Sequence, residues 1–208
     1  KILMREMQHR IANSLQIIAS ILLLKAGAVT SEEAKAELRE AHRRLMSVAE
    51  VQRHLNESGS IEQIEMGPYL TKLCDGLASS MVRPSQDIEI MIAADPGVLP
   101  SSHAVSIGLI VTELVINSLK YAFADVPSGA VIQVNFEIAK ADWKLTVADN
   151  GGGRKDREDS GERVGLGTAL IAALAKQMKA QVAETSTDKG MTVEVTRATF
   201  DSRLPRAA

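Results

Sequence analysis

The stretch ELVINSLKYA, residues 113–122, decides how the second half of this sequence is interpreted. It lies in a largely apolar segment, 101–123, which predicts one long helix. Glu113, Asn117, Lys120 and Tyr121 share one stripe of that helix, because they are spaced three or four residues apart. A carboxylate and an amide are costly to bury without partners. The stripe is therefore either the solvent-facing side of an amphipathic helix or the lining of a polar cavity.

The segments around this helix predict a mixed α/β domain over 61–200. Alternating apolar and polar residues indicate strands at 61–65, 87–93, 130–138, 143–149, 181–185 and 191–196. Segments 67–81 and 166–178 have helical spacing instead. We expect a mixed sheet with its helices on one face.

The first 57 residues contain no proline and predict two helices. Gly27 stands near the end of the first helix, and Ser31 before Glu32 is a start signal for the second. Two such helices form an antiparallel hairpin over 1–57. One hairpin has too small a core to be stable alone, so we expect a homodimer in which two hairpins form a four-helix bundle. The polar stretch 56–60 is a plausible linker.

His9 lies two residues from Met7 and two from Ile11, so at about 100° per residue it points away from the apolar stripe of the first helix. Asn13 and Gln16 follow on the same side. One interpretation is a histidine on a solvated helix face. The other is a nucleophile, because neutral imidazole has a free lone pair near pH 7 that could attack the γ-phosphate of ATP.

Two glycine motifs follow the long helix. DNGGG, residues 149–153, comes after a strand, and GLGT, residues 165–168, opens a helix. The first is either a tight turn or a place where the backbone approaches a ligand closely. The second offers backbone N–H groups at a helix start, which can bind phosphate, although a lone GxG is weak support.

These motifs, in this order, resemble those of one branch of the sensor histidine kinases. HRIANSLQ, residues 9–16, is similar to the HRxxNxLQ phosphoacceptor box of that branch. Residues 113–122, 149–153 and 165–168 are similar to the N box and the two glycine boxes of the GHKL ATPase superfamily. The resemblance extends from Glu6 to about Thr196. It implies an α+β fold: a helical hairpin followed by an α/β sandwich of the GHKL (Bergerat) type.

The resemblance also implies a role for each motif residue. His9 would be the autophosphorylation site, and Asn13 would help to remove phosphate from the partner. Asn117 would hold Mg²⁺, and Glu113 would orient water or take a proton. Asp149 would accept a hydrogen bond from the adenine amino group of ATP. The remaining nucleotide contacts would come from Lys120, Tyr121, Gly151, Gly153, Gly165, Leu166 and Gly167.

One residue departs from the commoner pattern of the histidine kinases. Where an acidic residue usually follows the histidine and helps to deprotonate it, this sequence has Arg10, which stays protonated. Glu6, three residues before His9, is a weak candidate for the base.

The implied activity is autophosphorylation of His9 by Mg-ATP, followed by transfer of the phosphoryl group to an aspartate on the receiver domain of a response regulator. A non-ATP-using histidine phosphotransferase with a degenerate ATPase domain is the alternative. A GHKL ATPase or protein-serine kinase in which His9 is incidental is a third interpretation.

Composition and charge indicate which partners, metal sites and cellular locations to expect. The 24 basic and 26 acidic residues give a net charge of −2 with no basic stripe, so no nucleic-acid partner is indicated. With Cys74 as the single cysteine, the chain cannot form an intrachain disulfide, which fits a cytoplasmic protein. We expect Cys74 to be a core residue. The scattered histidines give no zinc spacing. The apolar run 17–24 is too short to span a membrane, so we expect no direct membrane insertion. Because the chain starts mid-helix, a sensory domain is expected to be missing upstream.

Overall fold

The computed structural model describes residues 63–82, 87–123, 129–153 and 166–198, together with 27, 30–32, 34–35, 38 and 41–42. The chain divides into two compact units, 1–64 and 65–208. Nearly all of the described residues belong to the second unit.

The second unit is built on a mixed five-stranded sheet. Its strands stand in the order β2-β4-β5-β7-β6. β2 (Ile88–Ala94) runs parallel to β4 (Ala130–Ala139). The other pairings are antiparallel and join β4, β5 (Asp142–Asp149), β7 (Gly190–Arg197) and β6 (Gln181–Thr187). The short β1 (Gln63–Glu65) and β3 (Val98–Pro100) form a separate pair.

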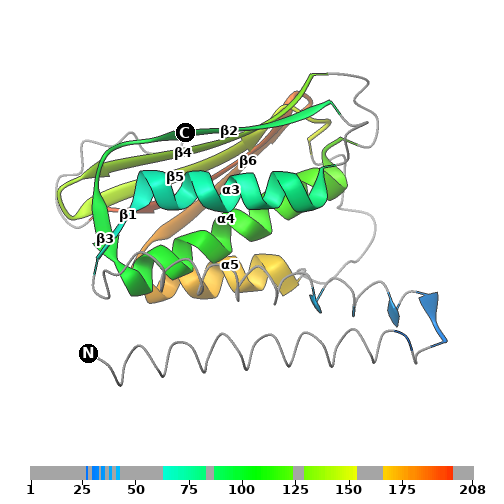
Figure 1. Ribbon diagram of the computed structural model, residues 1–208, viewed down its shortest axis with the longest axis horizontal. Coiled ribbons are helices and arrows are strands. Elements are labelled where there is room, and N and C mark those ends of the chain that lie inside the picture. The colour runs from blue at the N-terminus through cyan, green and yellow to red at the C-terminus, as the bar shows by residue number, and fades with distance from the viewer. Residues whose placement is uncertain are drawn as a thin grey trace. The chain divides into compact units, whose positions relative to one another are not determined.

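The helices α3 (Met66–Met81), α4 (Ser101–Tyr121) and α5 (Leu166–Gln177) cover one face of this sheet, and α4 contacts both of the others (Figure 1). Alternate residues are buried along most of β4, whereas β5 begins with four consecutive buried residues. The core includes Phe136 and Trp143, whose rings stack with centroids 6.2 Å apart. Each buried side chain of this size stabilises the fold by ~1.5–3 kcal/mol. Most of the middle of α4 is also buried in this core, whereas Tyr121 at its end is exposed.

The structure confirms the predicted elements of this unit, with ends that differ by one or two residues. In β2 the half-buried Ile88, Ile90 and Ile92 alternate with exposed residues, which agrees with the alternation from which this strand was predicted. Cys74 is buried and free, as predicted. The prediction missed β3, because three residues ending in a proline show no alternation that would indicate a strand.

α4 is, within the described residues, the one helix long and apolar enough to cross a membrane. In its most apolar window, 67% of the helix is buried inside the protein, as in a core helix. Length and composition are therefore weak support for a membrane span here.

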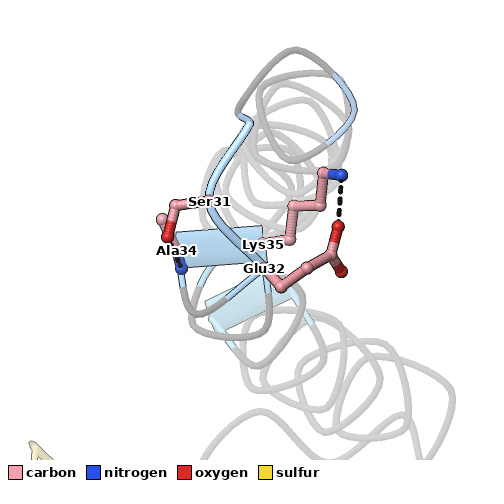
Figure 2. A network of polar contacts seen from close by, with 4 residues as sticks. All are labelled: Ser31, Glu32, Ala34 and Lys35. Carbon is pink, nitrogen blue, oxygen red and sulfur yellow. Dashed lines mark hydrogen bonds and ion pairs between the residues drawn. The ribbon is translucent and has the colours of Figure 1, made fainter.

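The predicted start of the second helix in the first unit is confirmed (Figure 2). Ser31 Oγ accepts a hydrogen bond from the backbone N–H of Ala34 at 3.3 Å, and the Ser31 carbonyl accepts one from Lys35 at 3.0 Å. Lys35 Nζ lies 2.6 Å from Glu32 Oε1 one turn along. This is the arrangement of a capped helix N-terminus. The remainder of the predicted hairpin, 1–26, 28–29, 33, 36–37, 39–40 and 43–57, lies outside the described residues.

α3 and α4 meet at Tyr69 and Gly108. A Cβ atom on Gly108 would lie 1.9 Å from Tyr69 Oη. Tyr69 is 8% exposed, and its hydroxyl has no hydrogen-bond partner among the described residues. Burial, and to a smaller degree Cys74, raises the pKa of Tyr69 above its ordinary value. The hydroxyl thus limits how bulky residue 108 can be.

The substitution Gly108→Ala should lower the free energy of unfolding by about 2 kcal/mol, because the tyrosine must move to accept the new methyl group. Tyr69→Phe should recover part of that loss, since it removes both the colliding atom and a buried hydroxyl without a partner. Gly76→Ala on α3 is the control: nothing lies within 4 Å of its Cβ position, so urea unfolding should show no loss. Equal effects of Gly108→Ala and Gly76→Ala would contradict the packing described here.

His103, in the first turn of α4, lies beside the end of β7. Its Nδ1 is 3.3 Å from Arg197 Nη1. Burial, and then the positive charge of Arg197, lower the pKa of His103 below its usual 6.5. The unfolded chain therefore binds a proton at this residue more readily than the folded chain does.

From this difference we expect the free energy of unfolding to fall as the pH drops from about 6.5 toward the lowered pKa of His103. The effect should be small because the imidazole is partly exposed. Denaturant unfolding at a series of pH values should show a flatter profile for His103→Gln than for the wild type. Identical profiles, or an NMR titration of His103 above 6.5, would rule this contribution out.

Candidate functional site

The polar stripe of α4 runs from the core to the surface. Glu113 is 2% exposed, Asn117 and Lys120 are half-buried, and Tyr121 is 58% exposed. The interpretation of this stripe as a solvated helix face is therefore wrong at Glu113. A carboxylate that deep in a domain is costly unless other groups compensate it, so its surroundings matter.

The start of α5 lies against Glu113. A Cβ atom on Gly167 would lie 1.8 Å from Glu113 Oε1 and 2.6 Å from its Cδ. Only a glycine backbone can come this close to the carboxylate. The N-terminal turn of a helix carries a partial positive charge, which favours a nearby negative group. Gly167 of the second glycine motif and Glu113 of the α4 stripe thus lie next to each other.

The carboxylate of Asp149, at the end of β5, is held by three donors. Its Oδ1 accepts hydrogen bonds from the backbone N–H groups of Gly151 at 3.1 Å and Met191 at 3.3 Å. Its Oδ2 accepts a hydrogen bond from Ser118 Oγ at 2.8 Å. The donors come from the glycine turn, β7 and α4. These three donors hold the Asp149 carboxylate in a fixed orientation, in which its oxygens act as hydrogen-bond acceptors.

The glycine turn packs against the C-terminal end of α4. Gly152 donates a hydrogen bond to the Ala122 carbonyl at 3.0 Å, and a Cβ on Gly151 would lie 2.2 Å from that oxygen. Gly153 has φ of 64°, and a Cβ there would lie 1.8 Å from the Thr187 carbonyl oxygen. Two of the three successive glycines are therefore required by close backbone contacts.

The Asn150 side chain binds this turn to the start of β4 by hydrogen bonds. Its Nδ2 donates to the Gly129 carbonyl at 2.9 Å, and its Oδ1 accepts from the Val131 N–H at 2.7 Å. The Asn150 backbone N–H also donates to the Val131 carbonyl at 3.2 Å, so three hydrogen bonds of this residue join the turn to the start of β4.

The three motifs of the second unit therefore meet in one region. Glu113 contacts Gly167, Ser118 binds Asp149, and Ala122 binds the glycine turn. Asn117 is one turn of α4 from Glu113 and adjacent to Ser118. No group of three acidic, histidine or cysteine side chains suited to a metal ion occurs among the described residues. A divalent ion here would need the Asn117 amide oxygen together with oxygens of its ligand, which is how Mg²⁺ is commonly bound with phosphates.

The other predicted site residues fall outside this description. His9, Asn13 and Gly165 lie outside the described residues, as do 154–164. Leu166 begins α5.

Sequence reasoning missed Ser118 and Met191, although both hold Asp149. Ser118 stands inside the motif at 113–122, but its partner is 31 residues away, so no local pattern identifies it. Met191 contributes only its backbone N–H, for which side-chain identity gives no signal.

Two family models match this chain. Residues 6–81 match a model described as histidine kinase, and residues 89–197 match one described as histidine kinase-like ATPase domain. The second alone covers more than half of the chain, and it includes α4, the glycine turn and α5.

Similar proteins include a sensor histidine kinase, PdtaS, of Mycobacterium tuberculosis. It is 27% identical over 170 residues, which are 82% of this chain and 34% of that protein. Blue-light-activated histidine kinase 2 of Erythrobacter litoralis is 26% identical over 197 residues, 91% of this chain and 55% of that protein. The chain thus spans a third to about half the length of these relatives.

A solved structure, the histidine kinase domain of the Erythrobacter litoralis EL346 blue-light activated kinase, has the same fold. It superposes with a TM-score of 0.68 at 21% identity, covering 88% of this chain and 94% of that one. At that identity the likeness is one of fold.

Replacing each of the three glycines by alanine in turn tests the turn geometry. Gly151→Ala and Gly153→Ala should each lower the free energy of unfolding by about 2 kcal/mol, because the new methyl group meets backbone atoms that cannot yield cheaply. Gly152→Ala is the matched control, since nothing lies within 4 Å of its Cβ position, and its effect should stay within about 0.5 kcal/mol. Urea unfolding measures all three. A neutral Gly151→Ala, or a Gly152→Ala as damaging as its neighbours, would be incompatible with this turn.

Proposed function

The chain belongs to the histidine kinase family, and from that premise we propose that it binds ATP with Mg²⁺ and transfers the γ-phosphoryl group to His9. The observation that supports the proposal best is the carboxylate of Asp149. Three donors of the described residues hold it, and Oδ2 accepts only one of them, which leaves this oxygen with capacity for a second donor. An exocyclic adenine amino group is a donor that matches it.

The other residues of the site have roles that fit their positions. The half-buried Asn117 supplies an amide oxygen for Mg²⁺. Bound there, Mg²⁺ would neutralise charge on the transferring phosphoryl group. Lys120 and Tyr121, farther along the stripe and closer to the surface, contact phosphates. The backbone at Gly151, Gly153, Gly165, Leu166 and Gly167 encloses the nucleotide.

Glu113 acts beside the start of α5. Its carboxylate lies against Gly167, so it orients water or takes a proton at the point where the backbone N–H groups of that helix end are available to phosphate. In this way one buried acid and one helix terminus act on the same end of the ligand.

His9 is the nucleophile. A neutral imidazole nitrogen forms the new N–P bond while the bond from phosphorus to the bridging oxygen of ADP breaks. The imidazole proton passes to a base, for which Glu6 is the candidate because Arg10 stays protonated. Positioning and charge neutralisation provide the catalysis.

The phosphoryl group then passes from His9 to an aspartate on the receiver domain of a response regulator, and Asn13 supports later removal of phosphate from that partner. In this proposal residues 1–57 form the dimerisation and phosphotransfer hairpin of a homodimer, and residues 61–200 form the ATP-binding domain. The kinase core acts in the cytoplasm.

Incubation with ATP labelled in the γ-phosphate tests the activity. The wild type should acquire acid-labile label, and His9→Ala should acquire none while it still binds ATP. Asp149→Asn should bind ATP roughly ten- to a hundredfold more weakly, because an amide NH₂ or a poorly placed oxygen replaces the acceptor. Calorimetry measures that affinity.

Two outcomes of this experiment would change the interpretation. Label that persists in His9→Ala would point to a serine kinase or another acceptor. A wild type that binds no ATP, yet accepts phosphate from a phosphorylated receiver domain, would indicate the non-ATP-using phosphotransferase.

A further inference from the structure

We propose that Ser118 is a positioning residue that makes the site select purines with a 6-amino group over purines with a 6-oxo group. The inference rests on the proposed function, in which the Asp149 carboxylate meets the base. It gives a role to Ser118, to which the family resemblance assigned none. It also predicts a preference for adenosine triphosphate over inosine triphosphate, which can be measured.

Ser118 is the only side chain among the described residues that donates a hydrogen bond to Asp149. Its Oγ lies 2.8 Å from Oδ2, and the residue is 8% exposed. The other two donors are backbone N–H groups, and both bind Oδ1. Oδ1 therefore already has two donors, while Oδ2 has one and keeps a second acceptor position. Among the described residues Ser118 alone holds Oδ2, so Oδ2 is the oxygen that we expect to meet a ligand.

The single hydroxyl proton of Ser118 is engaged with Asp149. Consequently neither group can donate a hydrogen bond at the position of the base that faces Oδ2. A 6-amino group donates there and is matched. A 6-oxo group would place a third acceptor beside the acceptor oxygens of Ser118 and Asp149. It is repelled because none of the three groups donates a hydrogen bond there, and an unpaired polar group of this kind produces specificity.

The serine matters for this discrimination because it prevents the carboxylate from adapting. Without the hydroxyl, Oδ2 loses its fixed donor, and the carboxylate can tilt or admit a water molecule. Water donates to both a carboxylate and a 6-oxo group, so it would relieve the repulsion that rejects inosine. Loss of Ser118 should thus weaken ATP binding and reduce the preference for ATP over ITP at the same time.

The chain contains a matched control for this serine. Ser106 lies on the same helix, is 5% exposed, and donates its hydroxyl to the Ser102 carbonyl at 3.0 Å. Ser106→Ala therefore removes a buried serine hydroxyl from α4 without touching Asp149. Ser118→Thr keeps the hydroxyl and tests rescue.

The experiment measures Kd for ATP and for ITP, each with Mg²⁺, by titration calorimetry on the full chain, with unfolding free energies recorded for every variant. We expect Ser118→Ala to raise Kd for ATP roughly tenfold and Kd for ITP by less than about threefold. Ser106→Ala should leave the ratio of the two constants at the wild-type value, and Ser118→Thr should restore it.

An unchanged ATP-to-ITP ratio in Ser118→Ala, or a change equal to that of Ser106→Ala, would overturn the role of Ser118 while leaving the kinase activity intact. Conversely, a wild type that prefers ATP in binding but acquires no label would overturn the kinase activity and leave the role of Ser118 supported. A wild type that binds neither nucleotide would overturn both.

Discussion

The carboxylate of Asp149 connects the structural elements that form this site. Three hydrogen bonds connect it to α4, to the turn that follows β5 and to β7. Hydrogen bonds to a charged group are stronger than those between neutral groups, so this junction fixes how the helix layer meets the end of the sheet. The same bonds leave Oδ2 with an open acceptor position. One group thus connects three elements of the fold and, in the proposed function, accepts a hydrogen bond from the nucleotide.

Close packing explains why the site uses glycines where it does. Gly151 approaches the end of α4, Gly153 approaches the β6–β7 hairpin, and Gly167 approaches Glu113, each closer than a Cβ atom permits. Because all three approaches involve backbone or a buried carboxylate, a side chain at any of these positions would force the neighbouring segments apart. Glu113 is buried on the core side of α4, whereas Tyr121 near the end of the helix is exposed. The polar stripe therefore runs along the helix from the core to the surface.

Much of this arrangement could be predicted from the sequence, and the failures have physical causes. Helical spacing placed Glu113 and Asn117 on one stripe, and alternation located the strands of the mixed sheet, because these signals are local. Ser118 was not identified, since its partner lies 31 residues away across the fold. Met191 acts through its backbone, and β3 is too short to show a period. The role of His9 stays a prediction that depends on family resemblance, because it lies outside the described residues.

The central claim is that a nucleotide binds where α4, the glycine turn and α5 meet. Backbone NMR of the chain, titrated with ATP and Mg²⁺, tests it most directly. The account predicts that the amide signals of Gly151, Gly152, Gly167 and Met191 shift together with a single saturation midpoint, while that of Gly76 on the exposed side of α3 stays in place. Saturable shifts confined to other elements, or no shifts at millimolar nucleotide, would contradict it.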